Sequence, residues 1–373
     1  MLYNWQHPDW PEFRFDPEVF RNRLVILAEH TGRVSGLLDA LPEQFGEDAE
    51  IDLMIDEAVH SSAIEGETLP RNEVMSSIRN RLGLNVIPEP VRDALARGAG
   101  NLMVAVRSSF AEPLTEDMLF EWHTLLLGDG GSPLKVGAWR HGSDPMQVVS
   151  GRIDRPTVHF EAPPSATVPL EMNRYVEWFN ATAQGGKSWI REAAVRSAIA
   201  HLYFESIHPF EDGNGRIGRA LSEKVLSQGL GRPAILSFSR AIESRRNDYY
   251  DALQAAQRGN EITEWISYFI DVVLSAQFMA EAQILFVVRK SHFLRQFADR
   301  FNERQSKAVH RMLEAGPEGF QGGMNARKYV SITKVSKATA TRDLQELVTM
   351  GALEAVGAGR SSGYELRLPE PKR

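Results

Sequence analysis

A helix that is apolar on most of its sides and runs directly into a glycine-rich loop constrains the fold of this chain more than any other feature. Residues 190–207, "IREAAVRSAIAHLYFESI", show this apolar pattern, which is typical of a helix buried at the centre of a domain. The next residues, 208–219, read "HPFEDGNGRIGR" and combine a histidine, acids, glycines and two arginines. A packed core does not need that mixture. The sequence therefore predicts a functional site at the end of a central helix.

This loop has the groups that a phosphate-binding site requires. Gly213 and Gly215 keep side chains away from a ligand next to the backbone, and the residues from Arg216 onward are predicted to form a helix. The unpaired amides and the dipole of a helix N-terminus attract phosphate. Arg216 and Arg219 lie three residues apart, so both can bind phosphate oxygens from one face of that helix.

Two further residues of the loop suit metal binding and proton transfer. Asp212 offers a hard oxygen ligand for Mg²⁺, which such phosphates carry. His208 ends the buried helix, and the ordinary pKa of a histidine, roughly 6.5, suits a general base. We interpret the loop as a site that binds a polyphosphate and moves a proton.

Three other interpretations of the same residues are open. The letters GNGRIG fit the GxGxxG pattern of dinucleotide-binding proteins, although that pattern follows a strand and a helix precedes it here. His201, Glu205 and His208 share one helical stripe, so they could bind a metal ion. The stretch could also be a capped helix turn with solvated charges.

The loop resembles the signature HxFx[DE]GNGRxxR of the Fic family of AMP transferases, and every fixed position agrees. The resemblance implies a mainly α fold: a helical Fic core at roughly residues 100–285 with a short β-hairpin flap. By this likeness, the chain transfers AMP from ATP to a hydroxyl of a target protein. His208 would deprotonate the hydroxyl, Phe210 would anchor the loop, and Asp212 would hold Mg²⁺ between the α- and β-phosphates.

The same resemblance assigns the remaining residues of the loop to the phosphates of ATP. Gly213, Asn214 and Gly215 would line the anion hole. Arg216 would meet the β-phosphate and Arg219 the γ-phosphate. The Doc-type branch of the family, which phosphorylates its targets, has a lysine where Gly215 stands, so the sequence favours AMP transfer.

A hairpin is predicted in the segment rich in glycine and proline before the central helix. The runs "MQVVS" (146–150) and "TVHFEA" (157–162) read as two short strands. They stand where the Fic family has its flap, which would bind a target segment by strand pairing. The letters "GAWR" (137–140) resemble the approach to that flap.

A second short motif lies on a predicted helix, residues 49–66. Ser61, Glu65 and Gly66 in "SSAIEG" fit the inhibitory pattern [ST]xxx[DE][GN] of the Fic family. By resemblance, Glu65 would pair with Arg219 and displace the γ-phosphate, so we expect a self-inhibited enzyme. The alternative is a solvated glutamate at the end of a surface helix. In some relatives this glutamate helps to remove AMP, which leaves a bifunctional AMPylase/deAMPylase open.

The C-terminal residues, 302–373, are predicted to form a winged helix. They hold 12 Lys and Arg against 8 Asp and Glu, although the whole chain has a net charge of −7. A helix at 336–351 begins at a serine cap and ends at glycine, and two alternating strands follow. The residues expected in its core are Leu344, Leu347 and Val348; those expected to face a nucleic acid are Lys334, Lys337, Thr339, Thr341, Arg342 and Arg360. The same fold could instead dock protein or support a homodimer.

The domain organisation follows from these assignments. We expect an N-terminal helical region at 1–99, the Fic core at 100–285, a connecting helix at 286–301 and the winged helix at 302–373. Helices are predicted at 17–41, 49–66, 71–82, 91–110, 115–127, 170–183, 190–207, from 216 onward and at 262–300.

Composition limits the setting of the protein. The chain has no cysteine, so disulfides and thiolate metal sites are excluded. The first residues lack a signal-peptide pattern and the run at 284–288 meets Arg289 and Lys290, so we expect no membrane segment and a cytoplasmic protein. Trp5 and Trp10 are expected to be packing anchors of the leader, although a binding site there is an alternative.

The leading hypothesis is thus a protein adenylyltransferase that acts on an unidentified protein hydroxyl, with Mg²⁺ as cofactor and ATP as substrate. A hypothesis of another class is a DNA-binding transcriptional regulator that uses the Fic core as a nucleotide sensor. His208 separates the two, because nucleotide sensing alone does not require a general base.

Overall fold

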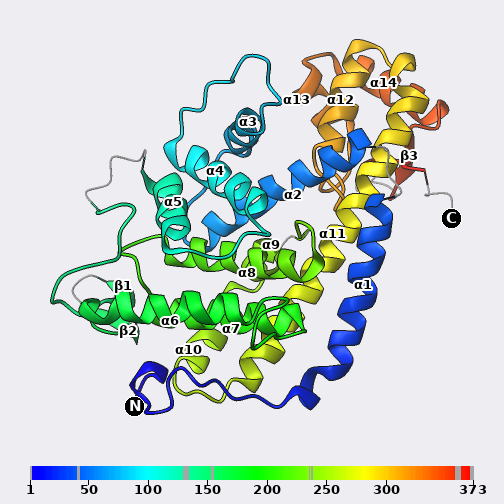
Figure 1. Ribbon diagram of the computed structural model, residues 1–373. Helices are drawn as coiled ribbons and strands as arrows, with labels where there is room; N and C mark the ends of the chain where they lie inside the picture. The colour runs from blue at the N-terminus through cyan, green and yellow to red at the C-terminus, as the bar shows by residue number, and fades with distance from the viewer. Residues whose placement is uncertain are drawn as a thin grey trace. The chain divides into compact units, whose positions relative to one another are not determined.

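The computed structural model of the chain describes residues 2–39, 43–128, 134–152, 155–234, 236, 238–357 and 363–369. This described part is mainly helical and contains two antiparallel sheets of two strands each (Figure 1). The predicted mainly α class is therefore confirmed. The winged-helix assignment stays a prediction, and Arg360 lies outside the described residues.

The α-helices follow one another along the chain as α1 (Arg21–Asp39), α2 (Glu43–Ile64), α3 (Arg71–Arg81), α4 (Ala94–Ser108), α5 (Glu116–Leu127), α6 (Val168–Ala181), α7 (Ala193–Ile207), α8 (Asn214–Leu230), α9 (Phe238–Glu243), α10 (Arg246–Ala256), α11 (Thr263–Phe297), α12 (Glu303–Leu313), α13 (Ala326–Thr333) and α14 (Lys337–Thr349). Four short 3₁₀ helices are η1 (Asn4–Gln6), η2 (Pro17–Phe20), η3 (Ser165–Thr167) and η4 (Ala298–Arg300). The strands are β1 (Gln147–Arg152), β2 (Arg155–Glu161), β3 (Leu353–Val356) and β4 (Gly363–Leu366).

Side-chain caps explain where several of these helices begin. The Thr115 hydroxyl accepts a hydrogen bond from the Met118 amide at the start of α5, and the Ser336 hydroxyl accepts one from the Thr339 amide at the start of α14. The Asp93 carboxylate caps α4, which therefore begins later than predicted. Two short helices, α9 and α10, were not predicted.

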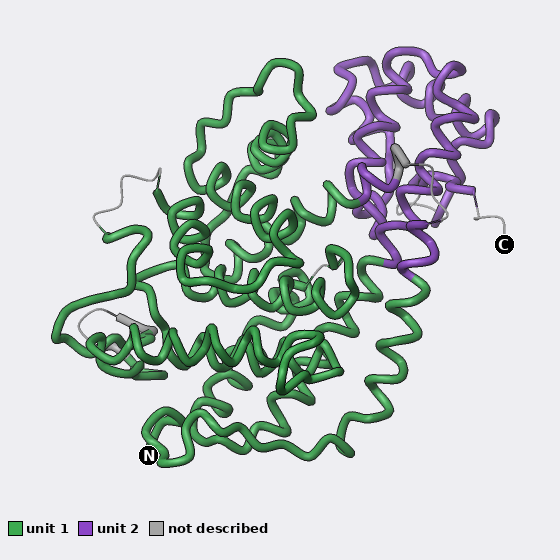
Figure 2. Tube along the Cα trace, in the orientation of Figure 1, with its two compact units in different colours: residues 1–33, 50–280 green, residues 34–49, 281–373 purple. Residues whose placement is uncertain are grey.

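The chain divides into two compact units (Figure 2). Unit 1 comprises residues 1–33 and 50–280, and unit 2 comprises residues 34–49 and 281–373. The predicted boundaries at 99/100 and 285/286 fall inside α4 and α11, which are continuous helices. The four-part division of the sequence stays a prediction.

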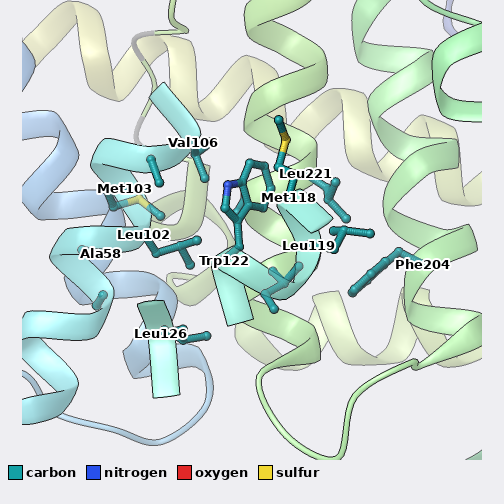
Figure 3. Packing of buried hydrophobic residues seen from close by; sticks show 14 of the residues in the cluster. Ala58, Leu102, Met103, Val106, Met118, Leu119, Trp122, Leu126, Phe204 and Leu221 are labelled. Atoms are coloured by element: carbon teal, nitrogen blue, oxygen red, sulfur yellow. The ribbon is translucent and has the colours of Figure 1, made fainter. Parts of the chain in front are cut away.

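The core of unit 1 brings α2, α4 and α5 together with the pair α7 and α8. In Figure 3, Trp122 of α5 lies among Leu102 and Val106 of α4, and Leu221 of α8 lies near Leu119. Ala58 of α2 belongs to the same cluster. The helix that carries the predicted inhibitory motif is therefore packed into the core.

The central helix α7 is buried as the sequence predicts. Residues 194–207 are all buried, and α7 packs along α8 (Figure 1). A Cβ added at Gly218 of α8 would collide with the Glu205 carboxyl, and one at Gly229 would collide with Ala193. Gly218 allows the close approach of α7 and α8 next to the loop that joins them, and Gly229 allows it at the opposite ends of the two helices.

Unit 2 contains α12, α13 and α14 followed by the antiparallel pair β3 and β4. The buried carboxylate of Asp343 on α14 accepts hydrogen bonds from Arg304 of α12 (2.9 and 3.2 Å) and from the hydroxyl of Tyr329 of α13 (3.0 Å). Leu344 and Leu347 are buried beside it, as predicted, and Val348 packs against the same core. One carboxylate thus joins the three helices of this unit.

One helix of the described residues, α11, is long and apolar enough to cross a membrane. Half of its most apolar window is buried inside the protein, and core helices of water-soluble proteins pass the same test of length and composition. The absence of a membrane segment stays a prediction.

Candidate active site

The chain turns sharply where α7 ends at His208. This residue has φ 51° and ψ 60°, a left-handed conformation that caps the helix, and its amide donates to the Phe204 carbonyl (2.9 Å). Arg140 binds the turn from the other side: its Nε donates to the His208 carbonyl (2.7 Å). The imidazole is therefore mounted on a fixed backbone.

The guanidinium of Arg140 is buried, and among the described residues its hydrogen bonds go to uncharged oxygens. Besides the His208 carbonyl, it donates to the Pro163 carbonyl (2.5 Å), the Ile207 carbonyl (3.3 Å) and the Ser165 hydroxyl (2.8 Å). Burial lowers the pKa of Arg140 to about 10, so it stays charged at neutral pH. Residues 137–140 were expected only to form the approach to the flap, and this role of Arg140 was not predicted.

The loop after His208 is closed by a pair of hydrogen bonds from one side chain. Asn214 Oδ1 accepts from the Phe210 amide (2.9 Å), and Asn214 Nδ2 donates to the Phe210 carbonyl (2.8 Å). Gly213 has φ 81°, which favours glycine, and α8 begins at the next residue. The first amides of α8 precede its first intrahelical bond, from Ile217 to the Gly213 carbonyl, so they face the loop as donors.

Phe210 anchors the loop by packing against a histidine that sequence analysis missed. His123 of α5 stacks on the Phe210 ring with centroids 4.1 Å apart. His123 Nδ1 accepts from the Gly137 amide (2.9 Å), so Nε2 carries the proton and donates to the Asp212 carbonyl (3.2 Å). Its only sequence signal is its place in the predicted helix 115–127.

The Asp212 carboxylate points away from the packed core and is 51% exposed. Its Oδ1 accepts hydrogen bonds from the Gly213 amide (2.5 Å) and from Arg216 Nη2 (3.2 Å). Within the described residues no group of three or more His, Cys, Asp or Glu could hold a metal ion. An exposed carboxylate on a loop suited to bind phosphate nevertheless fits Mg²⁺, which typically uses one or two carboxylates together with substrate phosphates.

Arg219 contacts the predicted inhibitory motif directly. Its Nη2 donates to Glu65 Oε1 (2.8 Å) and to the Ser61 carbonyl (2.8 Å), and its Nε donates to the Ser61 hydroxyl (2.9 Å). The side chain of Arg219 is only 1% exposed, and its buried Nη1 has no hydrogen-bond partner within the part of the chain that the structure describes. The contact that the motif predicts is present, whereas its inhibitory role stays a prediction.

The absence of a side chain at Gly215 leaves room for the Glu65 carboxylate. A Cβ at Gly215 would collide with Glu65 Oε1, and Arg219 Nη1 lies nearby. Gly66 follows with φ 88°, so the chain leaves α2 by a left-handed turn. The end of α2 therefore lies against the start of α8. The residues that form this contact are Ser61, Glu65, Gly215 and Arg219, and Gly66 forms the turn beside it.

Arg216 is held by a carboxylate that sequence analysis missed. Its Nη1 donates to Glu67 Oε2 (2.7 Å), while Nη2 binds Asp212, and its side chain is 4% exposed. Burial raises the pKa of Glu67, although Arg216 opposes that shift. Both arginines that the sequence assigns to phosphates thus contact acids from the end of α2.

The imidazole of His208 is neutral at physiological pH. Burial, with a smaller contribution from Arg140, lowers its pKa to about 4. Its Nδ1 lies 3.8 Å from Glu205 Oε2, and burial raises the pKa of that carboxyl to about 8. A neutral imidazole can accept a proton, as a general base must.

The alternative metal stripe does not form a site. His201 Nε2 lies 2.8 Å from the Tyr249 hydroxyl and Nδ1 lies 3.1 Å from the Ser222 hydroxyl, all of them buried. Burial lowers the pKa of His201 to about 3. It is a core histidine with hydrogen-bond partners. The dinucleotide interpretation fails as well, because the helix α7 precedes the loop.

The predicted hairpin is present, and the N-terminal leader packs against it. Strands β1 and β2 pair antiparallel; residues 153 and 154 of the connection lie outside the described residues. Trp5 Nε1 donates to the Glu161 carbonyl at the end of β2 (2.7 Å), and Tyr3 packs edge-on against Phe160. Trp10 Nε1 donates to Glu171 of α6 (3.0 Å). Trp10 also packs against the core of unit 1, whereas the packing role expected of Trp5 stays a prediction.

Comparisons with known proteins agree with this geometry. Residues 113–226 match the Fic/DOC family, and residues 3–84 match a domain of unknown function, DUF4172. The loop at 208–219 lies within the segment that matches the Fic/DOC family. The predicted inhibitory motif lies in the other matched segment.

The sequence of this chain is similar to those of proteins named protein adenylyltransferase Fic. A protein adenylyltransferase Fic of Culex quinquefasciatus is 27% identical over 264 residues, which is 67% of this chain and 48% of that protein. One of Nematostella vectensis is 27% identical over 208 residues, or 54% of this chain and 43% of that protein. This chain spans less than half the length of these relatives.

Two crystal structures show the same fold. A Fic family protein from Desulfovibrio desulfuricans aligns with a TM-score of 0.55 at 22% identity, covering 97% of this chain and 99% of that one. A Fic domain containing signaling protein from Bacteroides thetaiotaomicron aligns with a TM-score of 0.53 at 20% identity, covering 72% of this chain and 96% of that one.

Proposed function

We propose that this protein is a protein adenylyltransferase, which transfers AMP from ATP to a hydroxyl side chain of a target protein. The observation that carries the proposal is the arrangement around the start of α8. A neutral imidazole, an exposed carboxylate, a set of helix N-terminal amides and two buried arginines converge there. The relatives named protein adenylyltransferase Fic support the same activity.

The reaction requires one proton transfer and one displacement at phosphorus. Since His208 Nδ1 faces Glu205, Nε2 is the nitrogen that accepts the proton of the target hydroxyl. The hydroxyl oxygen attacks the α-phosphorus of ATP, the bond from that phosphorus to the bridging oxygen breaks, and pyrophosphate leaves with its electron pair. Transfer of this kind depends mainly on positioning and neutralisation of charge.

The phosphates would bind where the structure concentrates donors. The amides at the start of α8 and the loop of Gly213, Asn214 and Gly215 form the anion hole. Arg216 binds the β-phosphate and Arg219 the γ-phosphate, each by a planar guanidinium. Asp212 would hold Mg²⁺, which supplies positive charge to the phosphates.

In this proposal Glu65 restrains the enzyme, because it occupies Nη2 of Arg219, a donor that the γ-phosphate needs. A preference of about 2 kcal/mol for this closed arrangement leaves only a few percent of the molecules competent. The restraint fits the packing of α2 in the core, which gives the glutamate a defined position. Removal of AMP by the same site is the bifunctional alternative.

Labelling with nucleotide tests the proposal. We expect Glu65→Gly to raise AMP transfer from α-labelled ATP to itself or to proteins of a cell extract by about tenfold or more. Glu65→Gly combined with His208→Ala should lose the transfer but still bind ATP. Glu29→Ala, which removes an exposed carboxylate elsewhere, is the matched control. Transfer that is no faster in Glu65→Gly refutes the restraint, and transfer that survives without His208 refutes the general base.

The same assay with labelled GTP, UTP and CTP identifies the preferred base. It also separates the enzyme from a nucleotide sensor, because a sensor binds nucleotide without transferring label in any variant. The labelled band in the extract identifies the target protein.

We also propose that unit 2 contains a winged helix that contacts nucleic acid. Lys337, Thr341 and Arg342 of α14 are exposed, and Ser336 caps the helix that would face the ligand. Lys334 is exposed just before it. Binding to mixed DNA duplexes at low salt, weakened when Lys337 and Arg342 are both changed to Ala, is the expected result. No binding at low salt refutes this second role.

A further inference from the structure

We propose that Glu67 is a second inhibitory carboxylate, which competes with the phosphates of ATP for Arg216 while Glu65 competes for Arg219. The inference rests on the proposed function, since it deepens the regulation of the same site. The inhibitory motif of the sequence ends at Gly66 and does not include Glu67.

Each arginine contacts a different glutamate, and Arg216 also contacts Asp212 through Nη2. Arg219 Nη2 and Glu65 Oε1 are 2.8 Å apart, and Arg216 Nη1 and Glu67 Oε2 are 2.7 Å apart. Both arginines are almost completely buried, whereas Glu65 and Glu67 are 31% and 27% exposed. The acids therefore reach in from a surface segment, and they can withdraw into solvent without unfolding the core around the arginines.

The backbone at the end of α2 explains why two acids fit. The amides of Glu65 and Glu67 both donate to the Ser62 carbonyl (3.0 Å each), so one acceptor fixes the positions of both residues. Gly66 between them has φ 88°, a conformation that other residues rarely adopt. This turn carries the two carboxylates to two arginines that lie one helical turn apart on α8.

Each of the two arginines has a hydrogen-bond donor that neither glutamate uses. Arg219 Nη1 and Arg216 Nε are buried and have no hydrogen-bond partner among the described residues. Buried guanidinium groups with unused donors are costly to leave unsatisfied. A ligand richer in oxygens than two carboxylates, such as a triphosphate, would satisfy them, so the acids act as replaceable occupants.

Charge strengthens the argument for competition. Glu67 lies close enough to Glu65 and to Asp212 for both to raise its pKa, in addition to burial. Three acids thus surround two arginines. An incoming triphosphate would add further negative charge, so it binds the two arginines more weakly while both glutamates remain. Release of Glu65 alone frees Arg219 but leaves Arg216 occupied.

A cycle of four proteins tests the proposal: wild type, Glu65→Gly, Glu67→Ala and the double variant. Affinity for ATP with Mg²⁺ is measured by calorimetry, and AMP transfer by labelling. We expect Glu67→Ala alone to tighten ATP binding by about fivefold or more. The double variant should bind more tightly and transfer faster than Glu65→Gly.

Two further variants separate the contact from its charge. Glu67→Asp keeps the charge but shortens the side chain, so it should behave like Glu67→Ala. Glu29→Ala changes the net charge by the same amount at a distant exposed residue and should behave like wild type. Thermal unfolding of each variant checks that the fold is retained.

The outcomes distinguish this inference from the proposed function. If Glu65→Gly binds and transfers as expected but Glu67→Ala changes neither measurement in either background, the role of Glu67 is refuted and the enzyme stands. If no variant binds ATP, the proposed function is refuted and the inference with it.

Discussion

At the scale of single residues, the candidate base depends on neighbours that the sequence separates widely. His208 is fixed by Arg140, and Phe210 beside it is fixed by His123. The motif itself could be predicted because its residues are contiguous and chemically unusual. His123, Arg140 and Glu67 could not, because their roles arise only when distant segments fold together.

The pKa of His208 leads to a prediction about pH. Burial lowers that pKa to about 4, so the imidazole stays neutral at pH values where an ordinary histidine is protonated. We expect AMP transfer by the Glu65→Gly variant to persist at pH 5 to 6, with its acid limb centred at about pH 4 to 5. A pH–rate profile measures this limb. A midpoint of about 6.5 would contradict the assignment.

The lowered pKa of His208 also determines how this residue makes the stability of the fold depend on pH. The pKa of His208 is depressed in the folded protein relative to its ordinary value of about 6.5. The unfolded chain therefore binds more protons between these two values. The contribution of His208 to the free energy of unfolding falls as the pH is lowered through that window.

At the scale of elements, the helices follow from apolar periodicity and caps, as the Thr115 and Ser336 caps illustrate. The hairpin of β1 and β2 follows from two short β-like runs separated by a turn. The short helix α9 could not be predicted, since six residues do not establish a period. Nor could the packing of the leader on β2, which joins residues about 156 positions apart.

That packing predicts a local change in Trp5→Ala. Loss of the hydrogen bond to the Glu161 carbonyl and of the ring's packing should loosen the end of β2. We expect faster hydrogen exchange at the amides of residues 157–161, while α7 stays protected. Trp189→Ala is the control, because that residue is 46% exposed and belongs to neither the leader nor the hairpin. Equal exchange in Trp5→Ala and wild type would show that the leader does not hold the strand.

At the scale of the whole molecule, the chain forms two compact units, each with its own buried cluster of apolar side chains. The sequence indicated the separate character of the C-terminal residues through their charge. It did not indicate that residues 34–49 join that unit, because this association is a tertiary one.

Asp343 predicts how unit 2 responds to mutation. Burial raises the pKa of this carboxyl, but the hydrogen bonds from Arg304 and Tyr329 outweigh burial. The pKa therefore lies below its ordinary value, and the group is ionised at neutral pH. Asp343→Ala should lower the stability of unit 2 by about 1–3 kcal/mol, since it leaves donors of two helices unpaired. Native-state hydrogen exchange measures the loss at α12 and α13. Glu354→Ala, at an exposed position of β3, should change stability by less than about 0.5 kcal/mol.

Protection lost equally in unit 1 would contradict the division into two units. The same experiment applied to Glu65→Gly should leave unit 2 unchanged, because Glu65 contacts only residues of unit 1 in its hydrogen bonds to Arg219 and Ser62.

Arg140 has one more consequence for a protein whose net charge is −7. Its guanidinium meets carbonyls and a hydroxyl, so no contacting anion cancels its charge. This buried charge therefore adds a positive contribution to the potential beside the loop, although the net charge of the whole chain is negative. That contribution opposes the repulsion which the acids around the loop would exert on an approaching nucleotide.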